Sequence, residues 1–259
     1  MNLAWWCSGI SDTNWVWQPS YYPGIWALII ACIVIYFKFI NPKKNSKHTI
    51  FFFIGILLFW IMTDWPIGPI GAGYLLSIHV TQYLLYTFII APLLILSIPD
   101  QIYSHLFTLK IIKFANKIFL PFLLINLCLI ITHIPFVANL LKSYQIGTMI
   151  IDFIWIFAAL LFWFWIDPRF TKTHILPFPL RLFFVFALSI IPTIPGAFFV
   201  FSDYPIYSTY EFAVPISSLS PLQDQEIAGL IMWAGSTPIL LAWLGRIFYV
   251  WQKSEDVAN

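Results

Sequence analysis

Most basic residues of this 259-residue chain fall in alternate gaps between long apolar segments. A transmembrane helix needs ~20 predominantly apolar residues. Seven segments come close to or exceed that length, and they cover residues 24–40, 50–67, 71–98, 117–139, 146–166, 181–201 and 226–250. Continuous apolar runs indicate helices, because the strands of a barrel would alternate apolar and polar residues. The sequence therefore predicts an all-α, polytopic membrane protein built as a bundle of seven transmembrane helices.

The basic residues also indicate how the bundle is oriented, since Lys and Arg concentrate in cytoplasmic loops. Those that follow the first, third, fifth and seventh segments are Lys38, Lys43, Lys44, Lys47, Lys110, Lys113, Lys117, Arg169, Lys172, Arg181, Arg246 and Lys253. Lys142 alone lies in one of the other gaps, the one after the fourth segment. We expect the N-terminus outside and the C-terminus in the cytoplasm.

Composition supports a single integral membrane domain over residues 1–259. With 61% hydrophobic and 9% charged residues, the chain has no stretch suited to a sizeable soluble domain, and its surroundings are the lipid bilayer. The net charge of +2 gives no reason to expect a nucleic-acid partner. Three cysteines lack a paired spacing, so no disulfide framework is predicted. Aromatic residues flanking the first two segments predict an outer interfacial belt of Trp5, Trp6, Trp15, Trp17, Tyr21, Tyr22, Trp60 and Trp65.

Polar residues within the spans are the candidates for chemistry, because such groups are costly in hydrocarbon and often mark a site. His79, His133, Asp152 and Met232 lie on four different segments. Counted from the expected outer ends, at ~1.5 Å per residue, they lie ~9–12 Å deep. We therefore expect them in one outer layer of the bundle.

Local spacing supports a pocket in that layer. One face of the third segment carries four polar or aromatic residues at helical spacing, namely His79, Gln82, Tyr83 and Tyr86. The fifth segment repeats this arrangement with Thr148, Asp152 and Trp155. The sixth segment has Pro192 and Pro195, which interrupt helical hydrogen bonding, and irregular backbone at membrane depth needs neighbouring protein or a wet cavity. A polar pocket opening outward is the prediction.

Two interpretations of these polar groups are open from the residues alone. They can serve only as hydrogen bonds between helices. Alternatively, imidazole, carboxylate and thioether groups can bind copper, with Met favouring Cu(I). Enzyme activity is not expected, because the sequence has no GxSxG, HExxH or comparable element.

Several motifs resemble those of a known family. The run SPLQDQEIAGLIMW at 220–233 is similar to the seventh-helix signature of the CtaG-type cytochrome c oxidase assembly factors. YLLSIHVTQYLL at 74–85, THIPF at 132–136, LLFW at 160–163 and GAFFVFS at 196–202 continue the resemblance in the same order. It implies a seven-helix, non-enzymatic protein of the cytoplasmic (inner) membrane. Such a protein assists the maturation of a haem-copper oxidase by copper delivery and has oxidase subunits as partners.

The resemblance also implies a ligand set, although with departures. Tyr83 stands where the family has a second histidine on the third helix, and Thr148, Ile151 and Asp152 stand where a His-x-x-Glu-His element is often found. The copper ligands implied are His79, His133, Asp152 and Met232. The groups expected to orient them are Gln82, Tyr83, Thr148 and Asp224.

The missing histidines motivate a second hypothesis, a non-catalytic accessory subunit of a respiratory complex that keeps the family fold without a metal site. A third hypothesis is a haem ligated by His79 and His133 from opposite sides, since both lie at similar expected depth on consecutive helices.

Overall fold

The computed structural model describes residues 4–8, 15–40, 46–106, 119–169 and 176–256. In these ranges all regular structure is helical, as the sequence predicted. Four continuous stretches are long and apolar enough to cross a membrane. They are α4–η1–α5 (Leu76–Leu85, Tyr86–Ile90, Ala91–Leu96), α10 (Gln145–Ile166), α11–α12 (Phe178–Ile190, Thr193–Phe201) and α14–η2–α15 (Pro221–Leu230, Ile231–Gly235, Thr237–Asp256).

Two further candidate spans are bent. Helix α2 (Ser46–Thr63) meets α3 (Ile67–Gly73) at 51°, and α8 (Phe119–Thr132) meets α9 (Pro135–Lys142) at 81°. Counting each pair as one span gives up to six by length and composition. The predicted first segment is α1 (Pro23–Phe39), an apolar helix of 17 residues. The chain is thus a multi-pass helical protein, and a total of seven spans stays a prediction.

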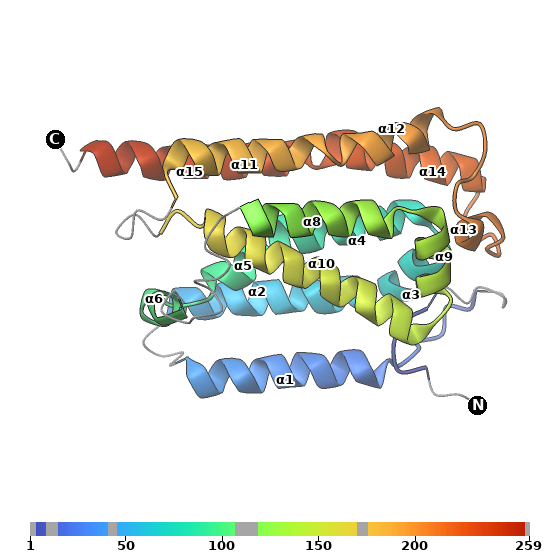
Figure 1. The fold of residues 1–259 in the computed structure, drawn as a ribbon. Coiled ribbons are helices and arrows are strands. Elements are labelled where there is room, and N and C mark those ends of the chain that lie inside the picture. Colours follow the sequence, from blue (N-terminus) through green and yellow to red (C-terminus); the bar gives the residue numbers. More distant parts are fainter. Residues whose placement is uncertain (1–3, 9–14, 41–45, 107–118, 170–175, 257–259) are drawn as a thin grey trace.

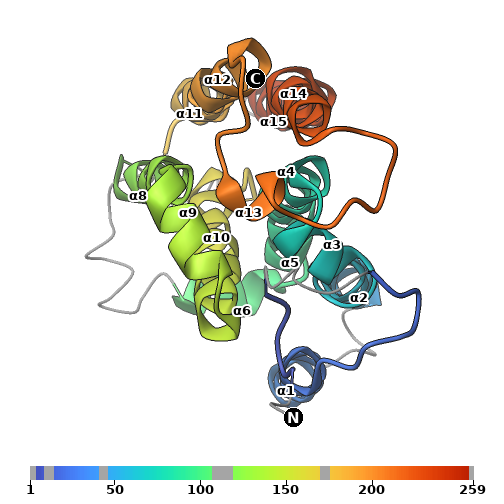
Figure 2. The same ribbon diagram turned by 90° about the vertical axis from the view of Figure 1, so that its right-hand side faces the viewer.

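The long helices run side by side, and their short companions gather at the ends (Figure 1). Residues 4–8, α3, α9 and α13 (Ser208–Glu211) lie together at one end, which we call the α9 end. Helix α6 (Asp100–Leu106) and the last turns of α15 lie at the opposite end. Viewed along the bundle, α11–α12 and α14–α15 form a pair on one side, and α1 lies on the other (Figure 2).

Charged groups join several elements at the end opposite α9. Arg169 Nη2 lies 2.6 Å from Asp167 Oδ2, and its Nη1 lies 3.3 Å from Asp100 Oδ1. Arg181 Nη1 donates to the Asp167 carbonyl at 2.7 Å. These arginines belong to the set that the sequence assigned to the cytoplasm. Six lysines of that set lie outside the described residues, namely Lys43, Lys44, Lys110, Lys113, Lys117 and Lys172.

The predicted start of the third span at residue 71 is wrong. Gly71 belongs to α3, and α4 begins at Leu76. The Asp224 carboxylate starts the new helix by accepting hydrogen bonds from the Leu76 N–H at 2.6 Å and the Ser77 N–H at 3.4 Å. A helix N-terminus leaves its first N–H groups free for such a partner. His79 therefore lies within the first turn of its helix rather than deep in it.

The fourth predicted span, 117–139, is also not one straight helix. Helix α8 ends at Thr132, and α9 begins at Pro135. Proline has no N–H and disfavours helical backbone at the residue before it, and Ile134 is accordingly extended, with φ −68° and ψ 121°. His133 thus lies at the bend, and its expected depth along a straight helix does not apply.

The residues expected to form the aromatic belt differ in exposure. Trp17 and Tyr21 are exposed. Trp6 and Tyr22 are buried instead, in a cluster with Cys7, Ile25 and Ala72 at the α9 end. The segment before α1 thus packs into the bundle and brings an indole to its interior.

Candidate functional site

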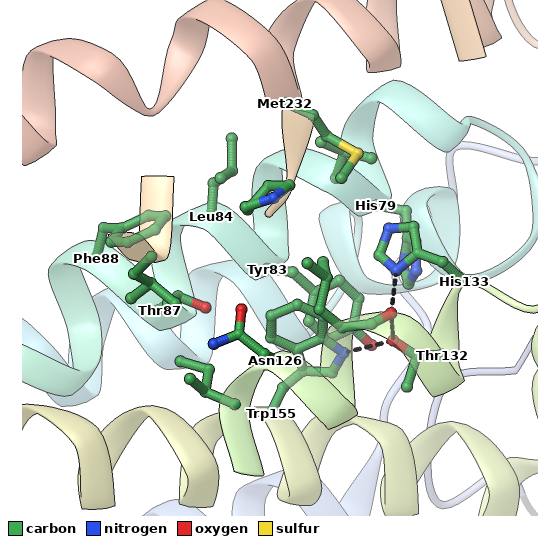
Figure 3. A pocket seen from close by; sticks show the side chains of 15 residues that line it. His79, Tyr83, Leu84, Thr87, Phe88, Asn126, Thr132, His133, Trp155 and Met232 are labelled. Carbon is green, nitrogen blue, oxygen red and sulfur yellow. Dashed lines mark hydrogen bonds between the residues drawn. The ribbon is translucent and has the colours of Figure 1, made fainter. Parts of the chain in front are cut away.

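A cavity of about 50 Å³ lies inside the bundle toward the α9 end. His79 from α4, His133 from the α8–α9 bend and Met232 from η2 all border it. Figure 3 shows these three side chains at one side of the cavity, with Thr87 and Asn126 farther from them. Three of the four ligands implied by the sequence therefore meet at a common space, although they come from three separate parts of the chain.

Irregular helix geometry surrounds this cavity. The π-helical turns η1 and η2 supply Thr87 and Met232 to its lining. The α8–α9 bend supplies His133, and the break between α11 and α12 supplies Pro192, in the region where the sequence predicted an interruption. Such π-helical turns occur often at functional sites. The concentration of four irregularities on one cavity marks it as the candidate site.

The imidazole of His133 is held in one orientation. Its Nδ1 lies 2.7 Å from the Leu129 carbonyl oxygen, which can only accept a hydrogen bond, so Nδ1 carries the proton. The Tyr207 hydroxyl donates to the His133 carbonyl at 3.1 Å, and the ring stacks on Phe199 with centroids 5.9 Å apart. The Nε2 lone pair of His133 is thereby left for another partner.

Asp152 lies in a different place from the other three implied ligands. Its carboxylate accepts from Trp6 Nε1 at 2.9 Å and from the Tyr83 hydroxyl at 2.9 Å. It borders a second, smaller cavity of about 10 Å³, together with His79, Tyr83, Lys142 and Thr148. His79 therefore lies between the two cavities, and both cavities are lined by His79 and Tyr83.

Lys142, the last residue of α9, contacts His79 directly. Its Nζ lies 3.0 Å from His79 Nδ1, and the side chain is buried. The Tyr210 ring lies against the ammonium, 5.4 Å from Nζ to the ring centroid. The lysine that departed from the charge pattern of the sequence is thus an interior residue of the site.

The residues expected to orient the ligands have distinct roles. The Gln82 side-chain amide donates to the Met62 carbonyl at 2.5 Å, and its oxygen lies close to Gly71. Tyr83 binds Asp152, whereas the Thr148 hydroxyl donates to the Tyr144 carbonyl of its own helix at 3.3 Å. Asp224 holds the start of the helix that carries His79. Gln82 and Asp224 therefore fix backbone around the site rather than touching His133 or Met232.

Sequence reasoning did not select Lys142, Trp6 or Tyr210 as site residues. The available signal was the position of Lys142 in a gap between segments that is expected to lie outside. A lysine that departs from the positive-inside pattern needs a local partner. Trp6 lies in an aromatic-rich segment, in which one buried indole cannot be distinguished from exposed neighbours. Tyr210 belongs to α13, and its hydroxyl donates to the Gly71 carbonyl at 2.7 Å.

In the far part of the larger cavity, the buried polar atoms without a partner among the described residues are oxygens. The Thr87 hydroxyl and the Asn126 amide oxygen are buried there, and neither has a hydrogen-bond partner among the described residues. Oxygen donors suit hard cations and water, whereas imidazole and thioether suit copper. Soft-ion chemistry is therefore restricted to the part bordered by His79, His133 and Met232.

The donor set fits a copper ion in part. Two imidazoles and one thioether at a common cavity match the preferences of Cu(I). In the described ranges, however, no three side chains among His, Cys, Asp and Glu form a group able to hold a metal ion. Any copper ion held here draws its ligands from Met232 and the two imidazoles.

Fold and site together define a multi-pass helical membrane protein with a buried polar site toward one end of its bundle. The family model of the cytochrome c oxidase caa3 assembly factor, Caa3_CtaG, matches residues 13–254. The chain therefore belongs to this family, as its motifs suggested, and family membership points to a non-catalytic role in oxidase assembly. No curated protein and no solved structure shows significant similarity to it.

Proposed function

We propose that the protein assists the maturation of a haem-copper oxidase in the cytoplasmic membrane by holding copper for delivery to an oxidase subunit. The observation that carries this proposal is the meeting of His79, His133 and Met232 at one cavity. Copper is the cargo here, and the chain acts as its carrier rather than as an enzyme. Its partners are the lipid bilayer and oxidase subunits.

His133 and Met232 each have a defined part in this proposal. His133 presents Nε2, because its Nδ1 proton is engaged by the Leu129 carbonyl. A hydrogen bond at the second nitrogen of a ligating histidine fixes the ring and raises its basicity. Met232 adds a thioether that favours Cu(I) over harder ions. The mostly apolar lining from α8 and α11 limits access of water to the ion.

The test is the copper content of the oxidase in a deletion strain. We expect oxidase activity and oxidase-bound copper to fall, and to be restored by the wild-type gene but not by His133→Ala or Met232→Leu. His48→Ala and Met149→Leu are matched controls, because His48 bonds the Leu96 carbonyl at 2.7 Å and Met149 packs beside the Trp6 cluster, so neither borders the cavity. Normal oxidase copper in the deletion strain would contradict the proposal.

The accessory-subunit alternative is favoured by one observation, the contact of Lys142 with His79. A subunit that has lost metal binding would co-purify with the mature complex and would tolerate the double variant His79→Ala plus His133→Ala. The haem alternative gains no support, because a cavity of about 50 Å³ is far below the ~300 Å³ typical of the smallest sites for organic ligands.

A further inference from the structure

The ammonium group of Lys142 is buried without a direct carboxylate partner. Its side chain is 2% exposed. In the part of the chain that the structure describes, the ion pairs within 4.0 Å all involve Arg169. A buried charge without such a partner is strongly destabilising unless other groups compensate it. The groups around Lys142 therefore have to supply that compensation.

Three neighbours supply it. His79 Nδ1 accepts at 3.0 Å, and the Tyr210 ring faces the ammonium. Asp152 borders the same small cavity and carries the opposite charge, held in place by Trp6 and Tyr83. One positive and one negative group thus balance each other inside the bundle. The cavity between them, about 10 Å³, is no larger than the space a single water molecule needs.

Contact with an ammonium decides the tautomer of His79. An ammonium group has donors only, so His79 Nδ1 accepts and the neutral ring carries its proton on Nε2. A metal needs a nitrogen lone pair, and both nitrogens of His79 are then engaged. His133 is in the opposite tautomer, with Nδ1 donating to Leu129 and Nε2 free. Only one of the two imidazoles is preset to bind a metal.

We propose that Lys142 lowers the metal affinity of this site, because its ammonium group occupies Nδ1 of His79 and places a positive charge beside the ligands. This inference rests on the proposed function and concerns its regulation. Copper is held by His133 and Met232, and His79 joins only when Lys142 leaves its Nδ1. The positive charge beside His79 also repels an incoming cation, an effect that is strong away from bulk water. A carrier built this way binds copper weakly enough to release it.

Lys142→Met tests the proposal, because methionine fills similar space without the charge. The measurement is the Cu(I) affinity of the full chain in detergent, by competition with a chromophoric chelator. We expect binding at least about tenfold tighter than in the wild type, since a unit charge close to the ligand is removed. The gain must disappear in Lys142→Met plus His79→Ala. Lys47→Met, at an exposed position near the start of α2, is the control and should change nothing.

A second variant covers the case in which Lys142→Met does not fold. Removing the ammonium leaves the Asp152 charge buried without its counter-charge. The double variant Lys142→Met plus Asp152→Asn removes both charges. The amide keeps one oxygen to accept from Trp6, and its NH2 group can donate to the Tyr83 hydroxyl, which also accepts. We expect it to be folded, as judged by thermal unfolding, and also to bind Cu(I) more tightly than the wild type.

Two results would overturn the inference: a wild-type affinity in the charge-free variants, or a gain that persists without His79. Either would leave the proposed function standing, because that is decided by oxidase copper in the deletion strain. Conversely, normal oxidase copper there, together with a tighter Lys142→Met, would reject copper delivery and retain the role of Lys142.

Discussion

Trp6 Nε1 donates a hydrogen bond of 2.9 Å to the carboxylate of Asp152, across 146 residues of sequence. The bond ties the segment before α1 to the middle of α10. It also completes the pair of donors that holds this carboxylate near the Lys142 ammonium. The N-terminal segment is therefore part of the site and not only an interfacial anchor.

Replacing that indole gives the first prediction. Trp6→Phe leaves Asp152 with one donor fewer in a buried position, which typically costs ~1–3 kcal/mol. We expect a lower thermal unfolding midpoint in detergent. Trp17→Phe is the matched control. Because Trp17 is 67% exposed, its replacement should change the unfolding midpoint very little. Equal midpoints for the two variants would show that the bond contributes nothing to stability.

The contact between Asp224 and the start of α4 gives a second prediction. Asp224→Ala removes the acceptor for the Leu76 and Ser77 N–H groups, and loss of such a cap costs ~0.5–2 kcal/mol. The thermal unfolding midpoint in detergent should therefore fall. Asp203→Ala, an exposed change in the preceding loop, is the control. Unchanged stability in Asp224→Ala would argue against a capping role.

The third prediction concerns close helix packing. A Cβ atom on Gly229 would lie 2.7 Å from the Gly196 carbonyl oxygen and 2.9 Å from Phe199 Cβ, so α12 and α14 must separate. We expect Gly229→Ala to destabilise the protein by ~1–3 kcal/mol, as overpacking does. At Gly245 an added Cβ meets no described atom within 4 Å. Gly245→Ala should be neutral or stabilising by up to ~1 kcal/mol in thermal unfolding, because alanine is the better helix former.

The fourth prediction concerns the thiol of Cys7, which donates to the Thr63 carbonyl at 3.2 Å. Burial, followed by the charges of Asp152 and Asp64, raises the pKa of Cys7 well above its ordinary value of 9.0. Only the thiolate is nucleophilic. In a Cys32→Ser plus Cys128→Ser background, maleimide should modify the folded protein much more slowly than the denatured one at about pH 8.

The same shift sets a pH dependence. Because folding raises the pKa of Cys7, its contribution to stability is fully present below pH 9.0 and is lost as the pH rises toward the folded value. We expect the unfolding midpoint of wild type to fall more steeply above that pH than the midpoint of Cys7→Ala. Parallel pH profiles for the two proteins would contradict this assignment.

Local sequence signals predicted the helical class and the family, because continuous apolar runs and the 220–233 motif depend on neighbouring residues only. The same logic failed at residues 71–76. The break there is produced by Asp224, which is 148 residues away from Leu76 in the chain. A contact of that range leaves no mark in the hydrophobic pattern of either segment.

The candidate site was predictable to a similar degree. His79, His133 and Met232 were selected as costly or metal-binding groups in apolar helices, and they border one cavity. The separation of Asp152 from them was not predictable, since it depends on Trp6 and Tyr83 engaging the carboxylate. The partner of Lys142 likewise emerged only from the 81° bend that turns α9 across the bundle.

That bend gives α9 a mechanical property. His133 lies just before α9 begins, and Lys142 is its last residue, so this short helix has the proposed ligand at one end and the competing charge at the other. The side chains of Phe136 and Leu140 on the same helix are exposed. Because one short helix links the two residues, any tilt of α9 displaces the His133 backbone and the Lys142 ammonium together.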